Sequence, residues 1–147
     1  MAVDIDLVLA ALDGSDEAAT AAEYAVALAD RYGADVHLLH VVEQRVMQGL
    51  ETGDVTPETV AEHQQSVTET ANQNLPDTVS CTASTVVGFS TDRLGQTPGS
   101  VTLDVAEDLD ADLIVVPRQT PGTSADGVIG KAALYILEYA SQPVLSV

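Results

Sequence analysis

The chain has 147 residues, 46% of them apolar, which is enough for one domain with its own core. Its 23 acidic residues against five Lys and Arg give a formal net charge of −18, a sign that repels nucleic acid. The sequence has no apolar run of membrane-spanning length and no recognisable leader. The single cysteine, Cys81, excludes an internal disulfide. We therefore expect a cytoplasmic protein that binds neither nucleic acid nor a membrane.

The acidic residues are scattered along the chain and do not form a tail, which argues against a disordered acidic segment. An acidic, lysine-poor surface indicates a host with a salt-rich cytoplasm, such as a halophilic archaeon, because salt screens the self-repulsion. The alternative is a partner with a basic face. We favour the halophile interpretation because no acidic block is localised.

The first half of the chain predicts strands at residues 5–12 and 35–42. Between them Ser15 is expected to cap a helix over residues 16–32 that Gly33 ends. Residues 43–55 are polar and are predicted to form an excursion over the sheet edge. Thr56 then caps a second helix that has Pro57 at its first position.

The second half repeats the alternation. A third strand is predicted at residues 79–87, a polar excursion at 88–97, a third helix at 98–109 and a fourth strand at 112–116. The chain then continues into a loop, a helix at 128–140 and a last strand at 143–147. Strands that alternate with helices imply right-handed crossovers and a parallel sheet, and near-continuous apolar strands suit a sheet covered on both faces. We predict one Rossmann-like α/β domain spanning residues 1–147.

Three segments carry a family resemblance. LVLAALDGSDEAATAAEYAVALADRYGADVHLLHVV, residues 7–42, is similar to the opening strand–helix–strand of the universal stress protein family. GQTPGSVTLDVAEDLDADLIVV, residues 95–116, resembles the third helix and fourth strand of that family, and residues 112–147 resemble its C-terminal half. The resemblance implies an open five-stranded parallel sheet in the order 3-2-1-4-5, with helices on both faces. It also implies a dimer, since many members are dimers.

Nucleotide-binding members carry G-x2-G-x9-G-[ST] after the fourth strand. At that spacing this chain has Pro117, Thr120, Gly130 and Lys131, so only one residue type is kept. Glycines let backbone N–H groups converge on a phosphate, whereas proline has no N–H and a β-branched threonine resists positive φ.

Other charges near this loop act in both directions. Asp126 is expected to cap the following helix with its own carboxylate, which would occupy the positive end of the helix dipole. Arg118 and Lys131 would instead attract phosphate. The sequence predicts weak ATP or AMP binding, or none.

Ligands in open α/β sheets sit where the strand order switches, here between the first and fourth strands. Asp13 resembles the acidic residue that contacts adenosine in nucleotide-binding relatives. The resemblance places Ala11, Leu12 and Val41 along an adenine pocket that Val116 closes. The alternative for Asp13 is a turn residue in Asp-Gly-Ser, where these residue types are favoured anyway.

The histidines do not predict a metal site. His37 and His40 differ by an odd number along a strand, so they face opposite sides of the sheet. His40 is expected to be packed or bonded to water. His63 lies mid-helix without a metal-binding pattern, and Ser15 lacks the surroundings of a hydrolase nucleophile. We predict no catalytic residue and no metal.

Three functions remain. The first is a regulatory stress protein that acts by dimerisation and by binding an unknown protein partner. Its dimer would form through the C-terminal edge strand, Pro143, Val144, Leu145, Ser146 and Val147. The second is an ATP- or AMP-binding nucleotide sensor. The third is an enzyme such as a pyrophosphatase with an SGGxDS loop, but here the loop reads LDGSDEA, which places carboxylates where phosphate needs donors.

Overall fold

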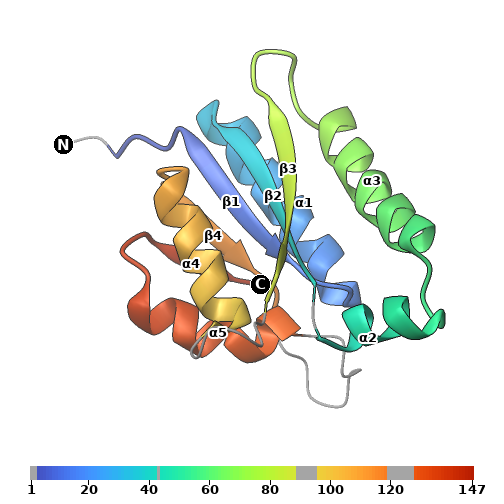
Figure 1. Ribbon diagram of the computed structural model, residues 1–147. Coiled ribbons are helices and arrows are strands. Elements are labelled where there is room, and N and C mark those ends of the chain that lie inside the picture. Colours follow the sequence, from blue (N-terminus) through green and yellow to red (C-terminus); the bar gives the residue numbers. More distant parts are fainter. Residues whose placement is uncertain (1–2, 43, 89–95, 119–127) are drawn as a thin grey trace.

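The five strands form one parallel sheet in the order β3-β2-β1-β4-β5 (Figure 1). This confirms the predicted fold class. The computed structural model describes residues 3–42, 44–88, 96–118 and 128–147. The strands are β1 (Leu7–Leu12), β2 (Asp35–Val42), β3 (Cys81–Val87), β4 (Leu113–Val116) and β5 (Val144–Ser146).

Helices cover both faces of the sheet, as expected. They are α1 (Asp16–Tyr32), α2 (Gln44–Thr52), α3 (Pro57–Gln73), α4 (Pro98–Asp108) and α5 (Val128–Tyr139). α1 and α3 pack on one face, and α4 and α5 pack on the other (Figure 1). The short helix α2 lies beyond the carboxyl ends of β1 and β2.

The core has two layers because alternate residues of each buried strand point to opposite faces. Val8, Ala10 and Leu12 of β1 pack with the alanines of α1, while Leu9 and Ala11 pack against α4 and α5. In a chain with 3% aromatic residues, these layers are built almost wholly from Ala, Val, Leu and Ile.

The sequence analysis did not predict helix α2 (Gln44–Thr52), which lies within the predicted excursion over the sheet edge. Gly49 lowers the helix propensity of this segment, so no clear helical signal appears there in the sequence. Its role is steric: a Cβ at Gly49 would lie 2.6 Å from the Cγ2 of Val55, and the N–H of Val55 donates to the carbonyl of Gly49 at 3.0 Å. The chain therefore turns tightly after α2 and brings Val55 back toward the sheet.

Local contacts mark the start of β1 and the end of α1. β1 begins two residues later than predicted, and before it the backbone N–H groups of Asp6 and Leu7 donate to Asp112 Oδ2 at 2.8 and 3.1 Å. Asp112 thus acts as a side-chain clamp just before β4. Gly33, with φ of 65°, ends α1 as predicted. The second predicted excursion falls mostly on residues 89–95, outside the described residues.

Candidate functional site

The carboxyl ends of β1, β2 and β4 meet where β1 pairs with β2 on one side and β4 on the other. This is the switch point at which open α/β sheets bind ligands. The predicted apolar lining residues divide between the two core layers there. Leu12 faces α1 and α3, whereas Ala11, Val41 and Val116 pack toward α4 and α5, and all four are at most 4% exposed.

Asp13, directly after β1, is engaged by the protein itself. Its Oδ1 accepts from the backbone N–H of Ser15 at 3.0 Å and from the Ser15 hydroxyl. Its Oδ2 accepts from the backbone N–H of Ile129 at 2.8 Å, in the first turn of α5. The side chain is 6% exposed. The carboxylate therefore occupies the positive end of the α5 dipole, where an anionic ligand would bind.

This contact corrects the prediction for Ser15. Ser15 is the residue before α1, but its side chain makes no cap bond because the hydroxyl donates to Asp13. The expected cap of α5, Asp126, lies outside the described residues. Asp13 supplies a carboxylate to that helix from 116 positions earlier, and no local sequence signal indicates it.

The glycine-poor loop is described only at its two ends. Pro117 is buried directly after β4, and Thr120 lies outside the described residues. Gly130 and Lys131 lie in the first turn of α5. Arg118 does not reach toward that helix: its backbone N–H donates to the carbonyl of Val147 at 2.7 Å, and its guanidinium donates to the carbonyl of Ser146 at 3.3 Å. The cation expected to attract phosphate is thus bonded to the end of β5.

A cavity of about 430 Å³ opens at the carboxyl ends of β1 and β2. Its floor includes Leu12, Asp13 and Val41, so three of the predicted site residues do converge. Sequence analysis missed the other walls, which come from α2, α3 and the turn between them: Val46, Val55, Thr59, Val60, His63 and Gln64. A smaller hollow of about 150 Å³ adjoins it and shares Leu12, Asp13, Gly14, His40 and His63.

Both cavities are lined by His40, which is 5% exposed and lies on the α1/α3 face of the sheet. Its Nε2 is buried without a hydrogen-bonding partner among the described residues. Burial, with smaller contributions from His63 and His37, lowers the pKa of His40 to about 4. The imidazole is therefore neutral at pH 7.

His37 lies on the other face, and its two ring nitrogens lie 2.7 Å from the hydroxyls of Thr82 and Ser84 on β3. Burial lowers its pKa too. The two histidines thus face opposite sides, as predicted. No group of three His, Cys, Asp or Glu side chains that would hold a metal ion occurs within the described ranges.

Another groove, of about 600 Å³, lies between α1 and α3, away from this edge. Its polar lining consists of exposed side chains: Glu23, Asp30, Ser66, Thr70 and Asn74. The polar side chains of this groove are exposed, whereas His40 Nε2 at the carboxyl edge is buried and unpaired among the described residues. We therefore place the candidate site at the carboxyl edge.

The buried histidine predicts acid sensitivity. Because the folded pKa of His40 lies below the unfolded value of ~6.5, the unfolded state binds more protons between pH 6.5 and 4. The contribution of the neutral His40 to the free energy of unfolding is fully present above pH 6.5. It is lost as the pH falls from 6.5 to 4, and the loss is at most about 3 kcal/mol. Urea unfolding at pH 7 and 4.5 measures this, and His40→Gln should lose less. An equal acid loss in both proteins would show that His40 is not responsible.

Comparison with known proteins identifies the family of this chain. The profile of the universal stress protein family matches residues 5–147. This chain belongs to that family. A comparison with curated proteins finds no match.

Solved structures of other universal stress proteins share the fold. UspA from Lactobacillus plantarum is 19% identical, with a TM-score of 0.71 and 99% of each chain covered. A universal stress protein in complex with cAMP is 20% identical, with a TM-score of 0.65 and coverage of 99% of this chain and 98% of that chain. One from Archaeoglobus fulgidus, in complex with dAMP, is 19% identical, with a TM-score of 0.62 and the same coverage. No helix among the described residues of this stress protein is long and apolar enough to cross a membrane.

Proposed function

We propose that this universal stress protein is a non-catalytic, cytoplasmic regulator that acts by self-association and partner binding and does not hold ATP. The observation that carries the proposal is the hydrogen bond from the N–H of Ile129 to Asp13 Oδ2. A carboxylate already lies at the start of α5, the loop has lost most of its glycines, and Arg118 is bonded to Ser146. Each of these features opposes triphosphate binding.

Native mass spectrometry of the purified protein tests this proposal. We expect the mass of the bare chain, or a multiple of it, with no adenine nucleotide attached. A protein that carries co-purified ATP would contradict the proposal, and nucleotide turnover would contradict its non-catalytic part.

The second candidate is a sensor of nucleotides such as AMP. It is favoured by the cavity beside Asp13 and Val41 and by the two relatives solved with cAMP and dAMP. Those ligands have one phosphate, so they need fewer contacts from the altered loop than ATP does. Measured affinities that rise from ATP to AMP would favour this candidate.

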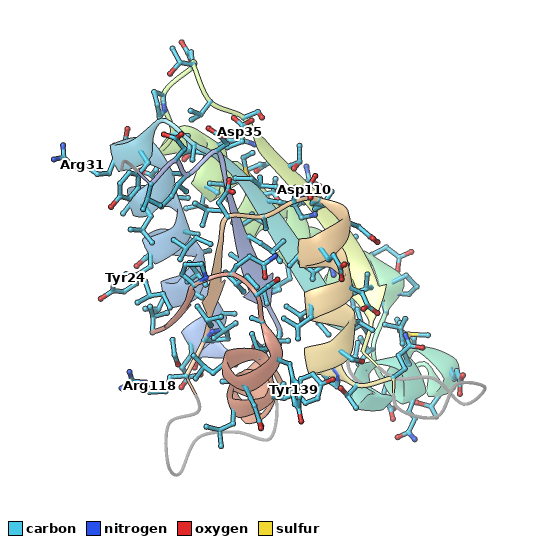
Figure 2. The ribbon with its side chains drawn as sticks, turned by 90° about the vertical axis from the view of Figure 1, so that its left-hand side faces the viewer. Tyr24, Arg31, Asp35, Asp110, Arg118 and Tyr139 are labelled. Carbon is cyan, nitrogen blue, oxygen red and sulfur yellow. The ribbon has the colours of Figure 1, made fainter. Side chains whose placement is uncertain are left out.

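Self-association is supported by where the charge lies. Residues 113–147 contain two acidic and two basic residues, Asp126, Glu138, Arg118 and Lys131, so the net charge of −18 lies entirely in residues 1–112. A second copy is therefore repelled least at this C-terminal part. β5 is an edge strand there, and apolar side chains of α5 are exposed nearby, including Leu134 at 80% and Tyr139 at 61%. Figure 2 shows Tyr139 and Arg118 at the surface of this part of the molecule.

The free edge of β5 can be tested with proline. The backbone groups of Pro143 and Val147 bond to β4, so in a parallel ladder those of Val144 and Ser146 point outward. Ser146→Pro removes an outward N–H. We expect wild type to sediment at twice its 15.3 kDa mass and the variant to sediment as a monomer.

The matched control is Ala83→Pro on the opposite edge strand, β3. On β3 and at its two ends, the even-numbered residues bond through their backbone to β2. The carbonyl of Ser80 accepts from the N–H of Val36, and the N–H of Gly88 donates to the carbonyl of Val42. Ala83 therefore also points its N–H outward, and this variant should remain a dimer. A monomeric wild type at high salt would refute the interface, as would a dimeric Ser146→Pro that still folds.

A salt-rich cytoplasm makes a separate prediction. With a net charge of −18, self-repulsion destabilises the compact state, and salt screens it within a Debye length of ~10 Å at 0.1 M and ~3 Å at 1 M. The melting temperature should rise by roughly 10 °C from dilute buffer to molar KCl. For a chain of this size, that rise corresponds to a gain of a few kcal/mol in the free energy of unfolding. Neutralising exposed charges on α3 with Glu58→Gln, Glu62→Gln and Glu69→Gln should reduce the rise. A flat or falling melting temperature would rule out the halophile interpretation.

A further inference from the structure

Helix α3 is packed much less tightly than α1, the other helix on the same face of the sheet (Figure 1). Both helices have 17 residues, and all residues of both are described. Six residues of α1 are buried, whereas Ala71 is the one buried residue of α3. Because most helical stability in proteins comes from packing of an apolar face, the flank of α3 that faces α1 has packing capacity left over.

The space between these two helices is the groove of about 600 Å³. Its floor is apolar, since Ala22, Val26 and Ala71 are buried and Val67 is half-buried. The distance between packed helices depends on the side chains at their contact, so a floor of alanines and valines lets another helix approach closely. Four further small side chains line the groove: Ala19, Ala27, Ser66 and Thr70.

Polar groups on the α3 side of the groove bond to their own helix. The hydroxyl of Thr70 donates to the carbonyl of Ser66 at 2.9 Å, and the amide nitrogen of Asn74 donates to the carbonyl of Thr70 at 2.8 Å. These donors are therefore already used. A small polar molecule would gain little from this wall, whereas an apolar surface can lie against it.

The charge of the groove comes from α1. Glu23 and Asp30 line it and are exposed, and among the described residues no hydrogen bond or ion pair engages either carboxylate. They are seven positions apart, two turns or ~10 Å along one side of the helix. No Lys or Arg is among the described lining residues, and α1 and α3 together carry seven acidic residues against Arg31. This charge favours a cationic occupant and disfavours nucleic acid, an anionic membrane or another acidic copy.

We propose that this groove docks a basic amphipathic helix of a partner protein. Small apolar side chains of that helix lie on the floor, and Lys or Arg residues seven positions apart pair with Glu23 and Asp30. The α1 wall runs from Ala19 to Asp30, ~16 Å, so the contact covers about three turns of the docked helix. The inference rests on the partner-binding part of the proposed function, and it specifies the surface and the chemistry of the partner.

Two synthetic peptides of about 15 residues test the proposal. The basic peptide has Ala and Leu on one helical face, Lys residues seven positions apart beside that face, and a terminal Trp. The acidic peptide has Glu in place of Lys. This chain contains no tryptophan, so fluorescence of the peptide reports binding directly. At the lowest KCl concentration that keeps the protein folded, we expect the basic peptide to bind at least ~10-fold more tightly than the acidic one.

Charge variants separate the groove from the overall charge. Glu23→Gln combined with Asp30→Asn should weaken binding of the basic peptide by ~10-fold, the effect of two exposed ion pairs. The matched control is Glu107→Gln combined with Asp108→Asn, which removes two exposed carboxylates from α4 on the opposite face. It should change the affinity by less than ~2-fold. Equal losses in the two variants would mean that net charge alone attracts the peptide, and the proposal would be wrong.

A steric variant tests the floor and walls independently. Ala27→Arg places a long cationic side chain in the groove from an exposed position, so the protein should fold and the basic peptide should lose at least ~10-fold in affinity. Ala61→Arg adds the same charge at an exposed position of α3 that does not line the groove, and it should bind nearly as wild type does. Equal binding by the two variants would contradict docking in the groove.

Methyl NMR of the wild-type protein locates the bound peptide. The basic peptide should shift the resonances of Ala19, Ala22 and Ala71 and leave those of Ala106 and Ala133, which pack on the other face, in place. Shifts confined to another surface overturn the inference, as does the absence of binding at millimolar peptide. Spermidine that binds as tightly as the peptide would also overturn it, because the groove would then be a site for small polycations.

Sedimentation and native mass spectrometry of the same samples report on self-association and on bound nucleotide. A nucleotide-free dimer that does not bind the basic peptide would overturn this inference and leave the rest of the proposed function in place. A dimer that the peptide dissociates would show that the groove is part of the contact between copies, and the inference would again be wrong.

Discussion

Restoring the family residues at three loop positions should raise the affinity for ATP by at least ~100-fold. The variant carries Pro117→Gly, Thr120→Gly and Lys131→Ser. Each contact regained with a charged ligand should contribute ~1.5–3 kcal/mol, and ~1.4 kcal/mol is tenfold in affinity. Glycine allows the backbone to approach phosphate oxygens, and the change from Pro117 also restores an N–H donor that proline lacks. Titration calorimetry of the variant against wild type gives the gain directly.

The matched control makes the same kinds of change elsewhere. Pro76→Gly and Thr78→Gly lie in the exposed connection before β3, at the opposite end of the sheet, and should not alter ATP binding. If the loop variant folds and shows no gain over this control, the missing glycines are not what prevents binding.

Asp13→Ala should be among the most destabilising single changes in the chain, at about 3 kcal/mol. It removes the acceptors for the N–H groups of Ser15 and Ile129 and for the Ser15 hydroxyl. Unpaired buried donors cost ~1–3 kcal/mol, and losing a carboxylate at a helix N-terminus costs ~1 kcal/mol more. Urea unfolding in high KCl measures the loss.

Two companion variants separate the causes. Asp13→Asn keeps the shape and one acceptor oxygen but loses the charge, so its loss should be intermediate. Asp16→Ala alters an exposed carboxylate in the first turn of α1 and should change the free energy of unfolding by no more than ~1 kcal/mol. If Asp13→Ala is no more destabilising than Asp16→Ala, Asp13 does not hold α5 in solution.

Local pattern was sufficient for most of the fold. Helix α1 and strand β2 have the predicted bounds because the acidic first turn of α1, Gly33 after it and the apolar run of β2 are all local signals. Strand alternation predicts a parallel sheet but not its order, which came from the family resemblance. Helix α2 was missed because Gly49 is there for a contact with Val55, a tertiary cause that helix propensity does not register.

The candidate site was less predictable because its parts come from distant segments. Asp13 was identified at the carboxyl end of β1, but its bond to Ile129 depends on how α5 docks against the sheet. His40 was expected to be packed or water-bonded. Its unpaired nitrogen becomes visible only once α3 and the turn after α2 form walls over the end of β2.

The central claim is that this chain binds ATP weakly or not at all. The reasons are the Asp13 carboxylate at the start of α5 and the loop that lacks most of the family's glycines. Titration of the wild-type protein with ATP in high-salt buffer, where the acidic surface is screened, tests it most directly. We predict a dissociation constant above roughly 100 μM, a binding free energy weaker than about −5.5 kcal/mol. Micromolar affinity would contradict the account.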